Sequence, residues 1–290
     1  MTIPGRILGV SAAWRVVSVS LLLVATHAQQ AFDTSGEIVQ HTLQHRTNPA
    51  AWDVWSVPFV RWDTVYFVAA AAEGYTYEQM LAFQPGIVGL LRLAGYASLN
   101  YEWSPTVAVL ITTVLANAAT WLSPLLLYYA LRNLTKSERL AEKAALLSII
   151  APASTSALSA PTPEPFYSFF TLLGLVLLSD GRATYAFLRR LLAACFFAAA
   201  TSFRANGILL TGFLVWHAAW MPQRQGIGLW LGRMLAVLPL VGLAIFPWAA
   251  FQAWAYARLC TGGMISPWCT ATLPLAYSYI QSVYWYVSVC

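Results

Sequence analysis

The sequence predicts an all-α protein that crosses a membrane several times as one domain over residues 1–290. Of the 290 residues, 59% are hydrophobic and 9% are charged, whereas a soluble domain carries about 25% charged residues. The mean hydropathy is +0.62, and the abundant Trp, Tyr and Phe suit core and interface positions in a bilayer. The basic residues lie in short groups between apolar runs rather than in one patch, so no nucleic-acid partner is expected.

The first apolar run, 16–32, follows Arg6 and Arg15 and predicts the first span. A signal peptide is the rival interpretation, because basic residues followed by an apolar stretch are typical of both. The N-terminal region is long for a signal peptide, which favours a span.

The segment 33–104 differs in composition from its surroundings and predicts a large loop between spans. It holds seven of the eleven acidic residues but only three of the sixteen basic ones. Its second half, 64–96, mixes aromatic and aliphatic residues with polar ones, which predicts short amphipathic helices lying in the membrane interface.

Further spans are expected within 105–257, because about 20 apolar residues suffice to cross the hydrocarbon core. Arg204 interrupts one of the runs, which therefore predicts a hairpin turning at Arg204-Ala205-Asn206-Gly207. Such broken helices are tolerated where they line an enclosed cavity. The expected runs are 105–131, 144–160, 166–178, 191–220 and 234–257.

The basic groups give an orientation, because Lys and Arg are enriched in cytosolic connections. Placing the N-terminus and the connections 132–143, 182–190 and 224–233 in the cytosol accounts for eleven of the sixteen basic residues. The acidic loop 33–104 and the segment 258–290 then face the lumen or exterior, where Cys260 and Cys269 could form a disulfide.

Asp63 is the first candidate for chemistry. It precedes a helix-like run, so it could be a helix N-cap. Alternatively, a carboxylate at the membrane boundary beside Arg61 and Trp62 could act as a general base with a tuned pKa. Glu73 and Glu78 are further acids of the same loop, or simply a solvated helix face.

Arg204 is the second candidate, because a charge within an apolar run usually marks a ligand path or a partner. A guanidinium binds phosphate well through its paired donors, so an anionic ligand head is the expected counterpart. The alternative is an interfacial anchor for the hairpin tip. Glu164, in the turn Pro161-Thr162-Pro163-Glu164-Pro165, is a candidate acid or an exposed turn charge.

No metal site or cofactor is predicted. The four cysteines and four histidines show no metal-binding spacing, and neither a glycine-rich phosphate loop nor a nucleophile motif occurs.

Four ordered sequence blocks resemble the GPI mannosyltransferase 2 family. The first combines Arg61-Trp62-Asp63 with Glu73-Gly74-Tyr75 and Phe83-Gln84-Pro85, and Gln84 stands where the family tends to have an aromatic residue. The other blocks are Ser159-Ala160-Pro161 with Glu164, then Thr201 with Arg204, Asn206 and Gly207, and finally Pro267-Trp268-Cys269 with Tyr277, Gln281 and Trp285.

The resemblance implies a GT-C type glycosyltransferase of the endoplasmic reticulum membrane with a large first luminal loop. Such an enzyme transfers mannose from dolichyl-phosphate mannose to the GPI precursor, adding the second, α-1,6-linked mannose with inversion and without a bound metal. A small membrane partner subunit is compatible with it. By resemblance Asp63 is the base, and the substrate-binding candidates are Arg61, Trp62, Glu73, Glu78, Glu164, Arg204, Asn206 and Gln281.

The resemblance also implies that the family continues beyond Trp285 with further spans, so a C-terminally truncated chain is expected. The alternative function is therefore a catalytically inactive truncated paralogue, or a transporter or other non-enzymatic membrane protein. Asn133-Leu134-Thr135 is a glycosylation sequon, and its basic neighbours predict that it is cytosolic and unmodified.

Overall fold

The computed structural model describes residues 2–28, 56–98, 102–150, 155–181, 185–219, 227–261 and 266–285. Every regular element in these ranges is a helix, which confirms the all-α prediction. Four helices are long and apolar enough to cross a membrane: Ile3–Thr26, Pro105–Thr135, Ala186–Phe203 and Ile227–Cys260.

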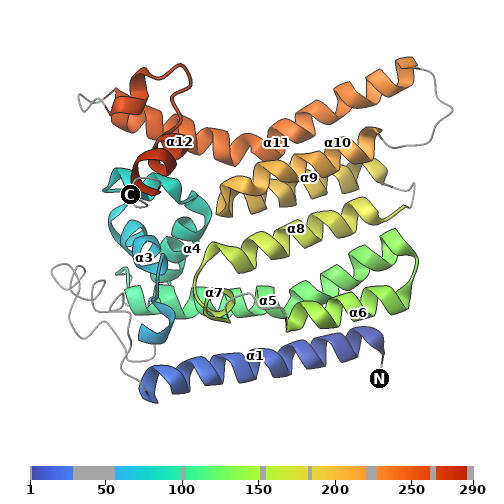
Figure 1. Ribbon diagram of the computed structural model, residues 1–290, viewed down its shortest axis with the longest axis horizontal. Coiled ribbons are helices and arrows are strands. Elements are labelled where there is room, and N and C mark those ends of the chain that lie inside the picture. The colour runs from blue at the N-terminus through green and yellow to red at the C-terminus, as the bar shows by residue number, and fades with distance from the viewer. Residues whose placement is uncertain are drawn as a thin grey trace.

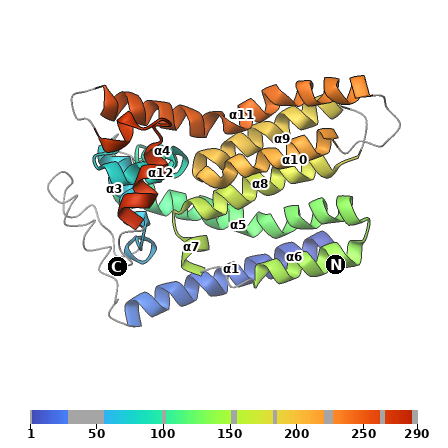
Figure 2. The ribbon, with the colours of Figure 1, turned by 45° about the horizontal axis from the view of Figure 1, so that its top comes forward.

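The four long helices and the shorter α8 (Pro163–Ser179) lie side by side and follow one another across the molecule (Figure 1). Helix α1 (Ile3–Ala28) packs against α5 (Pro105–Thr135), which packs against α8. Helix α8 in turn packs against α9 (Ala186–Phe203), and α9 packs against α11 (Ile227–Cys260). Figure 2 shows the same succession after rotation.

Short helices gather at the end of this bundle that lies away from the N-terminus (Figure 1). They are α3 (Thr64–Glu73), the 3-10 helix η3 (Glu78–Ala82), α4 (Pro85–Gly95) and α12 (Ala276–Ile280). We call this end the loop end. The short helices expected in the second half of the acidic loop are therefore present, and Phe67, Val68 and Leu91 anchor them in a shared apolar core with α5.

Helix α1 begins at Ile3, earlier than the expected span 16–32. Both arginines before that run therefore belong to the helix. Arg6 forms an ion pair with Glu142 of α6 (Glu138–Ile149). Arg15 is buried, and its guanidinium donates to the Ser159 hydroxyl at 3.5 Å. The arginines thus serve helix packing rather than marking the edge of the span, and residues 29–32 lie outside the described ranges.

The run 144–160 is not one straight span in the structure. Helix α6 ends at Ile149, and the five-residue α7 (Thr155–Ser159) follows after four residues outside the described ranges. Two side chains of α5 bond to the backbone of α7. The Asn117 amide and the Thr120 hydroxyl donate to the Ser159 and Leu158 carbonyl oxygens, respectively, at 3.1 Å each. These two hydrogen bonds hold α7 against α5.

The run 191–220 is broken at Arg204, as the sequence predicted. Helix α9 ends at Phe203, Arg204 has an extended backbone, and the chain continues through η4 (Ala205–Leu210) into α10 (Thr211–Ala219). Figure 1 shows α10 running back beside α9. The turn lies at the loop end, so the hairpin carries Arg204 toward the short helices.

A disulfide joins Cys260, the last residue of α11, to Cys269 in η5 (Pro267–Thr270), with the Cα atoms 5.5 Å apart. This confirms the cysteine pairing that the sequence offered. The buried Trp268 indole packs with Leu81 and Ile280, so the disulfide holds the C-terminal segment against the loop end of α11.

Candidate functional site

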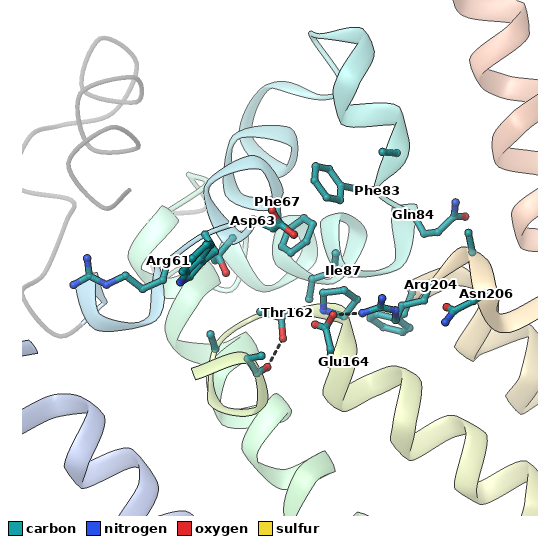
Figure 3. A pocket seen from close by; sticks show the side chains of 18 of the residues that line it. Arg61, Asp63, Phe67, Phe83, Gln84, Ile87, Thr162, Glu164, Arg204 and Asn206 are labelled. Carbon is teal, nitrogen blue, oxygen red and sulfur yellow. Dashed lines mark hydrogen bonds and ion pairs between the residues drawn. The ribbon is translucent and has the colours of Figure 1, made fainter. Parts of the chain in front are cut away.

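A cavity of about 690 Å³ opens at the loop end (Figure 3). All four sequence blocks that carry the family resemblance contribute to it, although the first and the last are more than 200 residues apart in the sequence. Seven of the nine predicted site residues are among its lining: Arg61, Trp62, Asp63, Glu164, Arg204, Asn206 and Gln281.

Three helices begin at the cavity wall. Asp63 precedes α3, Gln84 precedes α4, and Thr162 precedes α8, and all three residues line the cavity. The start of an α-helix carries a partial positive charge and free backbone N–H groups. The cavity is therefore suited to carboxylates and to an anionic ligand group.

Asp63 occupies the N-cap position of α3, but its side chain makes no capping hydrogen bond. Its backbone angles are helical, φ −60° and ψ −18°, whereas a capping residue is usually extended. The N-cap interpretation of its side chain is therefore wrong. Desolvation raises the pKa of the Asp63 carboxyl, the Glu164 carboxylate raises it further, and Arg204 lowers it.

Trp62 has a left-handed backbone conformation, with φ 51°. This region is unfavourable for a residue with a Cβ atom, and strained residues of this kind concentrate at functional sites. Trp62 is 80% exposed and lines the cavity. Packing of the apolar core therefore does not explain why a tryptophan stands at this position. Arg61 also lines the cavity, but its side chain extends away from Glu164 and Arg204 (Figure 3).

Glu164 and Arg204 form an ion pair that joins the first turn of α8 to the residue after α9 (Figure 3). The two side chains are 36% and 39% exposed, so both are accessible from the cavity. Glu164 is a carboxylate in the first turn of a helix, where the helix dipole stabilises it. The guanidinium expected to meet an anionic ligand thus has a carboxylate partner within the chain.

Two glycines allow the backbone segments of the site to approach closely. A Cβ atom on Gly86, in the first turn of α4, would lie 2.6 Å from the Ser202 carbonyl oxygen of α9. A Cβ atom on Gly207 would lie 2.5 Å from the Thr201 Cα atom. The acidic loop and the Arg204 turn are therefore packed backbone against backbone, which positions Gln84 relative to Arg204.

The C-terminal segment contributes Tyr277 and Gln281 to the cavity. The Gln281 amide donates to the Tyr277 hydroxyl at 3.0 Å, and the backbone N–H of Tyr277 donates to Gln252 of α11 at 3.4 Å. Asn206 lies in η4 beside Arg204 and is exposed to the cavity.

Glu73 and Glu78 are not among the lining residues, unlike the other predicted site residues. Glu73 is the last residue of α3. The Glu78 carboxylate accepts a hydrogen bond from the Trp268 indole at 2.7 Å and one from the Tyr284 hydroxyl at 3.4 Å. Glu78 therefore binds the C-terminal segment to the loop, which is a positioning contact.

Sequence reasoning missed several residues of the cavity wall. Phe67 and Phe83 line it with their rings 5.0 Å apart, edge to face. Thr64 and Gln84 also line it and are buried. Gln84 departs from the pattern of the resembled family, and that departure was the available signal for a role of its own.

Among the residues that the structure describes, no group of three or more His, Cys, Asp or Glu side chains is arranged to hold a metal ion.

The comparisons with known proteins agree with the blocks that meet at the cavity. The family model described as "Mannosyltransferase (PIG-V)" matches residues 10–290. The GPI mannosyltransferase 2 of Cryptococcus neoformans var. neoformans serotype D (strain JEC21) is 29% identical over 290 residues, 94% of this chain. That of Aspergillus fumigatus is 32% identical over 248 residues, 80% of this chain.

A mammalian relative is similar to the same extent. The GPI alpha-1,6-mannosyltransferase 2 of Cricetulus griseus is 31% identical over 262 residues, 78% of this chain. The matches cover 63%, 50% and 51% of the three relatives, so the chain spans roughly half to two thirds of their length. No solved structure matches the chain. Because the family model covers nearly all of the sequence, the chain belongs to the PIG-V mannosyltransferase family.

Proposed function

We propose that this chain carries the catalytic cavity of a GPI mannosyltransferase that moves mannose from dolichyl-phosphate mannose to the GPI precursor, forming an α-1,6 linkage. One observation carries the proposal: four distant sequence blocks line a single cavity containing Asp63 and the Glu164–Arg204 pair. The names of the similar proteins give the substrate class. The fold is proposed to be of the GT-C type, with residues 33–104 forming a large luminal loop.

The orientation supports this chemistry. The cysteine pair lies at the same end of the bundle as the cavity, and disulfides form in oxidising compartments such as the lumen of the endoplasmic reticulum. This supports our proposal that the cavity faces the lumen. Arg132 and Lys136, at the far end of α5, then lie in the cytosol, as the positive-inside rule requires.

Asp63 acts as the general base. The hydroxyl of the acceptor mannose loses its proton to the Asp63 carboxylate as its oxygen attacks C1 of the donor mannose. The bond between C1 and the phosphate oxygen breaks with its electron pair staying on phosphate, so dolichyl phosphate leaves and the configuration inverts. Asp63 is exposed to solvent at the cavity, but partial desolvation raises the pKa of its carboxyl, and a raised pKa makes a carboxylate a better proton acceptor near neutral pH.

Arg204 and the three helix starts bind the donor phosphate. Arg204 pairs with Glu164 in this structure, and a phosphate oxygen is an equally suitable acceptor for the guanidinium. The helix starts add free N–H groups and partial positive charge. The exposed Trp62 ring offers an apolar face to the sugar or to the lipid chain.

Complementation tests the proposed function. Cells that lack the second GPI mannosyltransferase are given this chain, or this chain joined to the C-terminal part of the Cryptococcus relative. Restored surface display of a GPI-anchored protein by either form supports the proposal. Loss of that rescue in the Asp63→Asn version links the activity to the cavity. Failure of both forms, with normal membrane insertion, favours the inactive or non-enzymatic alternative.

A further inference from the structure

Among the residues that the structure describes, two buried polar side chains on the cavity wall find no hydrogen-bond partner. Gln84 is 3% exposed, and neither its amide nitrogen nor its amide oxygen is bonded. The Thr64 hydroxyl is fully buried and equally unpartnered. Buried polar groups are nearly always hydrogen-bonded in native proteins, and an exception requires an explanation.

Local structure does not explain either residue. Gln84 occupies the N-cap position of α4, but its side chain makes no capping bond. Its backbone is held by the close approach of Gly86 to Ser202. Thr64 is the first residue of α3, directly after Asp63. Both residues line the cavity, and Gln84 lies in the neighbourhood of Arg204 and Asn206 (Figure 3).

The chemistry of the amide indicates the kind of ligand. A glutamine amide has N–H donors and a carbonyl acceptor, and both ends are unsatisfied here. A phosphate group at neutral pH offers mainly acceptors, so it would leave the amide oxygen without a partner. A pair of neighbouring hydroxyls both donates and accepts, and satisfies both ends.

We propose that Gln84 and Thr64 form a hydroxyl-binding subsite that recognises a hexose ring in the cavity. The subsite is distinct from the phosphate-binding role of Arg204, and the Phe67 and Phe83 rings, which line the same cavity, suit the apolar face of a sugar. The proposal rests on the proposed function for its ligand, a mannose carried either by the lipid-phosphate donor or by the glycolipid acceptor.

The test is Gln84→Met, a substitution of similar volume without the amide. Replacing an unsatisfied buried polar group by an apolar one is neutral or stabilising. The expected result is an unchanged or higher melting temperature together with a loss of roughly tenfold or more in kcat/KM. Thr64→Val should behave in the same way. A rise in KM for the donor alone assigns the subsite to the donor sugar, and a rise for the acceptor alone assigns it to the acceptor.

Thr112→Val is the matched control. Thr112 is likewise fully buried with an unpartnered hydroxyl, but it lies on α5 and is not among the lining residues. Thr112→Val should retain both KM values and kcat. If Gln84→Met and Thr64→Val also retain both KM values and kcat, the two side chains lack hydrogen-bond partners without binding a sugar, and the subsite does not exist.

A binding measurement separates this inference from the proposed function. The probes are a short-chain polyprenyl phosphate with and without mannose, and a synthetic mannosylated GPI acceptor with and without its terminal mannose. The protein should bind at least one mannosylated probe more tightly than its sugar-free counterpart, and Gln84→Met should remove that preference even if no transfer is detected. Equal affinity for each pair of probes would overturn the subsite, whatever the transfer assay gives.

Discussion

At the scale of single residues, the charges of the cavity act on one another. Glu164 raises the pKa of Asp63 and Arg204 lowers it, while Glu164 and Arg204 are themselves paired. The three groups therefore form one electrostatic unit, in which the proton affinity of Asp63, the proposed base, depends on the charges of Glu164 and Arg204. Substituting either member of the pair should change the base as well.

The pH dependence of transfer tests this coupling. A base must be deprotonated to act, so kcat/KM should fall as the pH decreases through the raised pKa of Asp63. Glu164→Gln removes a negative neighbour and should move this acid limb to lower pH. Arg204→Ala removes a positive neighbour and should move it to higher pH. Shifts in the same direction for both variants would contradict the assignment of the limb to Asp63.

Arg204 itself can be tested by its two substitutions. Arg204→Lys keeps the charge but loses the paired donors, so we expect a partly active protein with a higher KM for dolichyl-phosphate mannose. Arg204→Ala should lose activity on the order of 100-fold, again mainly through the donor. If Arg204 only holds the hairpin tip to α8, both variants should instead lower the amount of inserted protein and leave the specific activity unchanged.

At the scale of elements, the site depends on the close contact between α4 and α9. Gly86→Ala should be destabilising by about 1–3 kcal/mol, because its Cβ atom would overlap the Ser202 carbonyl oxygen. Gly89 lies one turn later on the same helix, and a Cβ atom added there would meet no atom within 4 Å. Gly89→Ala should therefore stabilise by up to about 1 kcal/mol. Thermal unfolding in detergent measures both changes, and equal melting temperatures would contradict the close approach.

The same elements show what sequence patterns can and cannot predict. The break at Arg204 was predictable because a charge interrupts an otherwise apolar run. The break between α6 and α7 was missed, although Pro152 and Ser154-Thr155-Ser156 within the run 144–160 were sequence signals for it. Residue types alone also could not predict that the two glutamates have different places. Glu78 accepts a hydrogen bond from Trp268, whereas Glu164 lines the cavity.

At the scale of the whole molecule, the proposed orientation places the cavity in the lumen and the N-terminus in the cytosol. Asn133 lies at the end of α5 away from the cavity, where its amide donates to the Ser179 hydroxyl at 3.3 Å. The sequon should therefore carry no glycan. Glycosidase treatment followed by gel mobility measures this, with an engineered sequon in the segment 29–55 as the positive control. A glycan on Asn133 would invert the orientation and move the cavity away from the luminal donor.

The helix bundle and its loop end were largely predictable, because apolar runs indicate the spans and basic connections indicate which ends of the spans lie on the same side. The convergence of blocks from residues 61 to 281 on one cavity was not, because it depends on packing between distant segments such as Gly86 against Ser202. The resemblance to a family identified the blocks, and the structure adds that they meet.

The most direct test of the account is mannosyl transfer by Asp63→Asn in isolated membranes. The Asp63 side chain does not cap α3, so the substitution should not disturb the helix. A carboxyl whose pKa is raised in the folded state contributes stability that is lost as the pH rises through that pKa, so Asn should leave the melting temperature at neutral pH unchanged or higher. We predict normal insertion, unchanged or higher stability and transfer reduced by roughly 100-fold or more. Near-normal transfer by the inserted variant would contradict the role of Asp63 as the base.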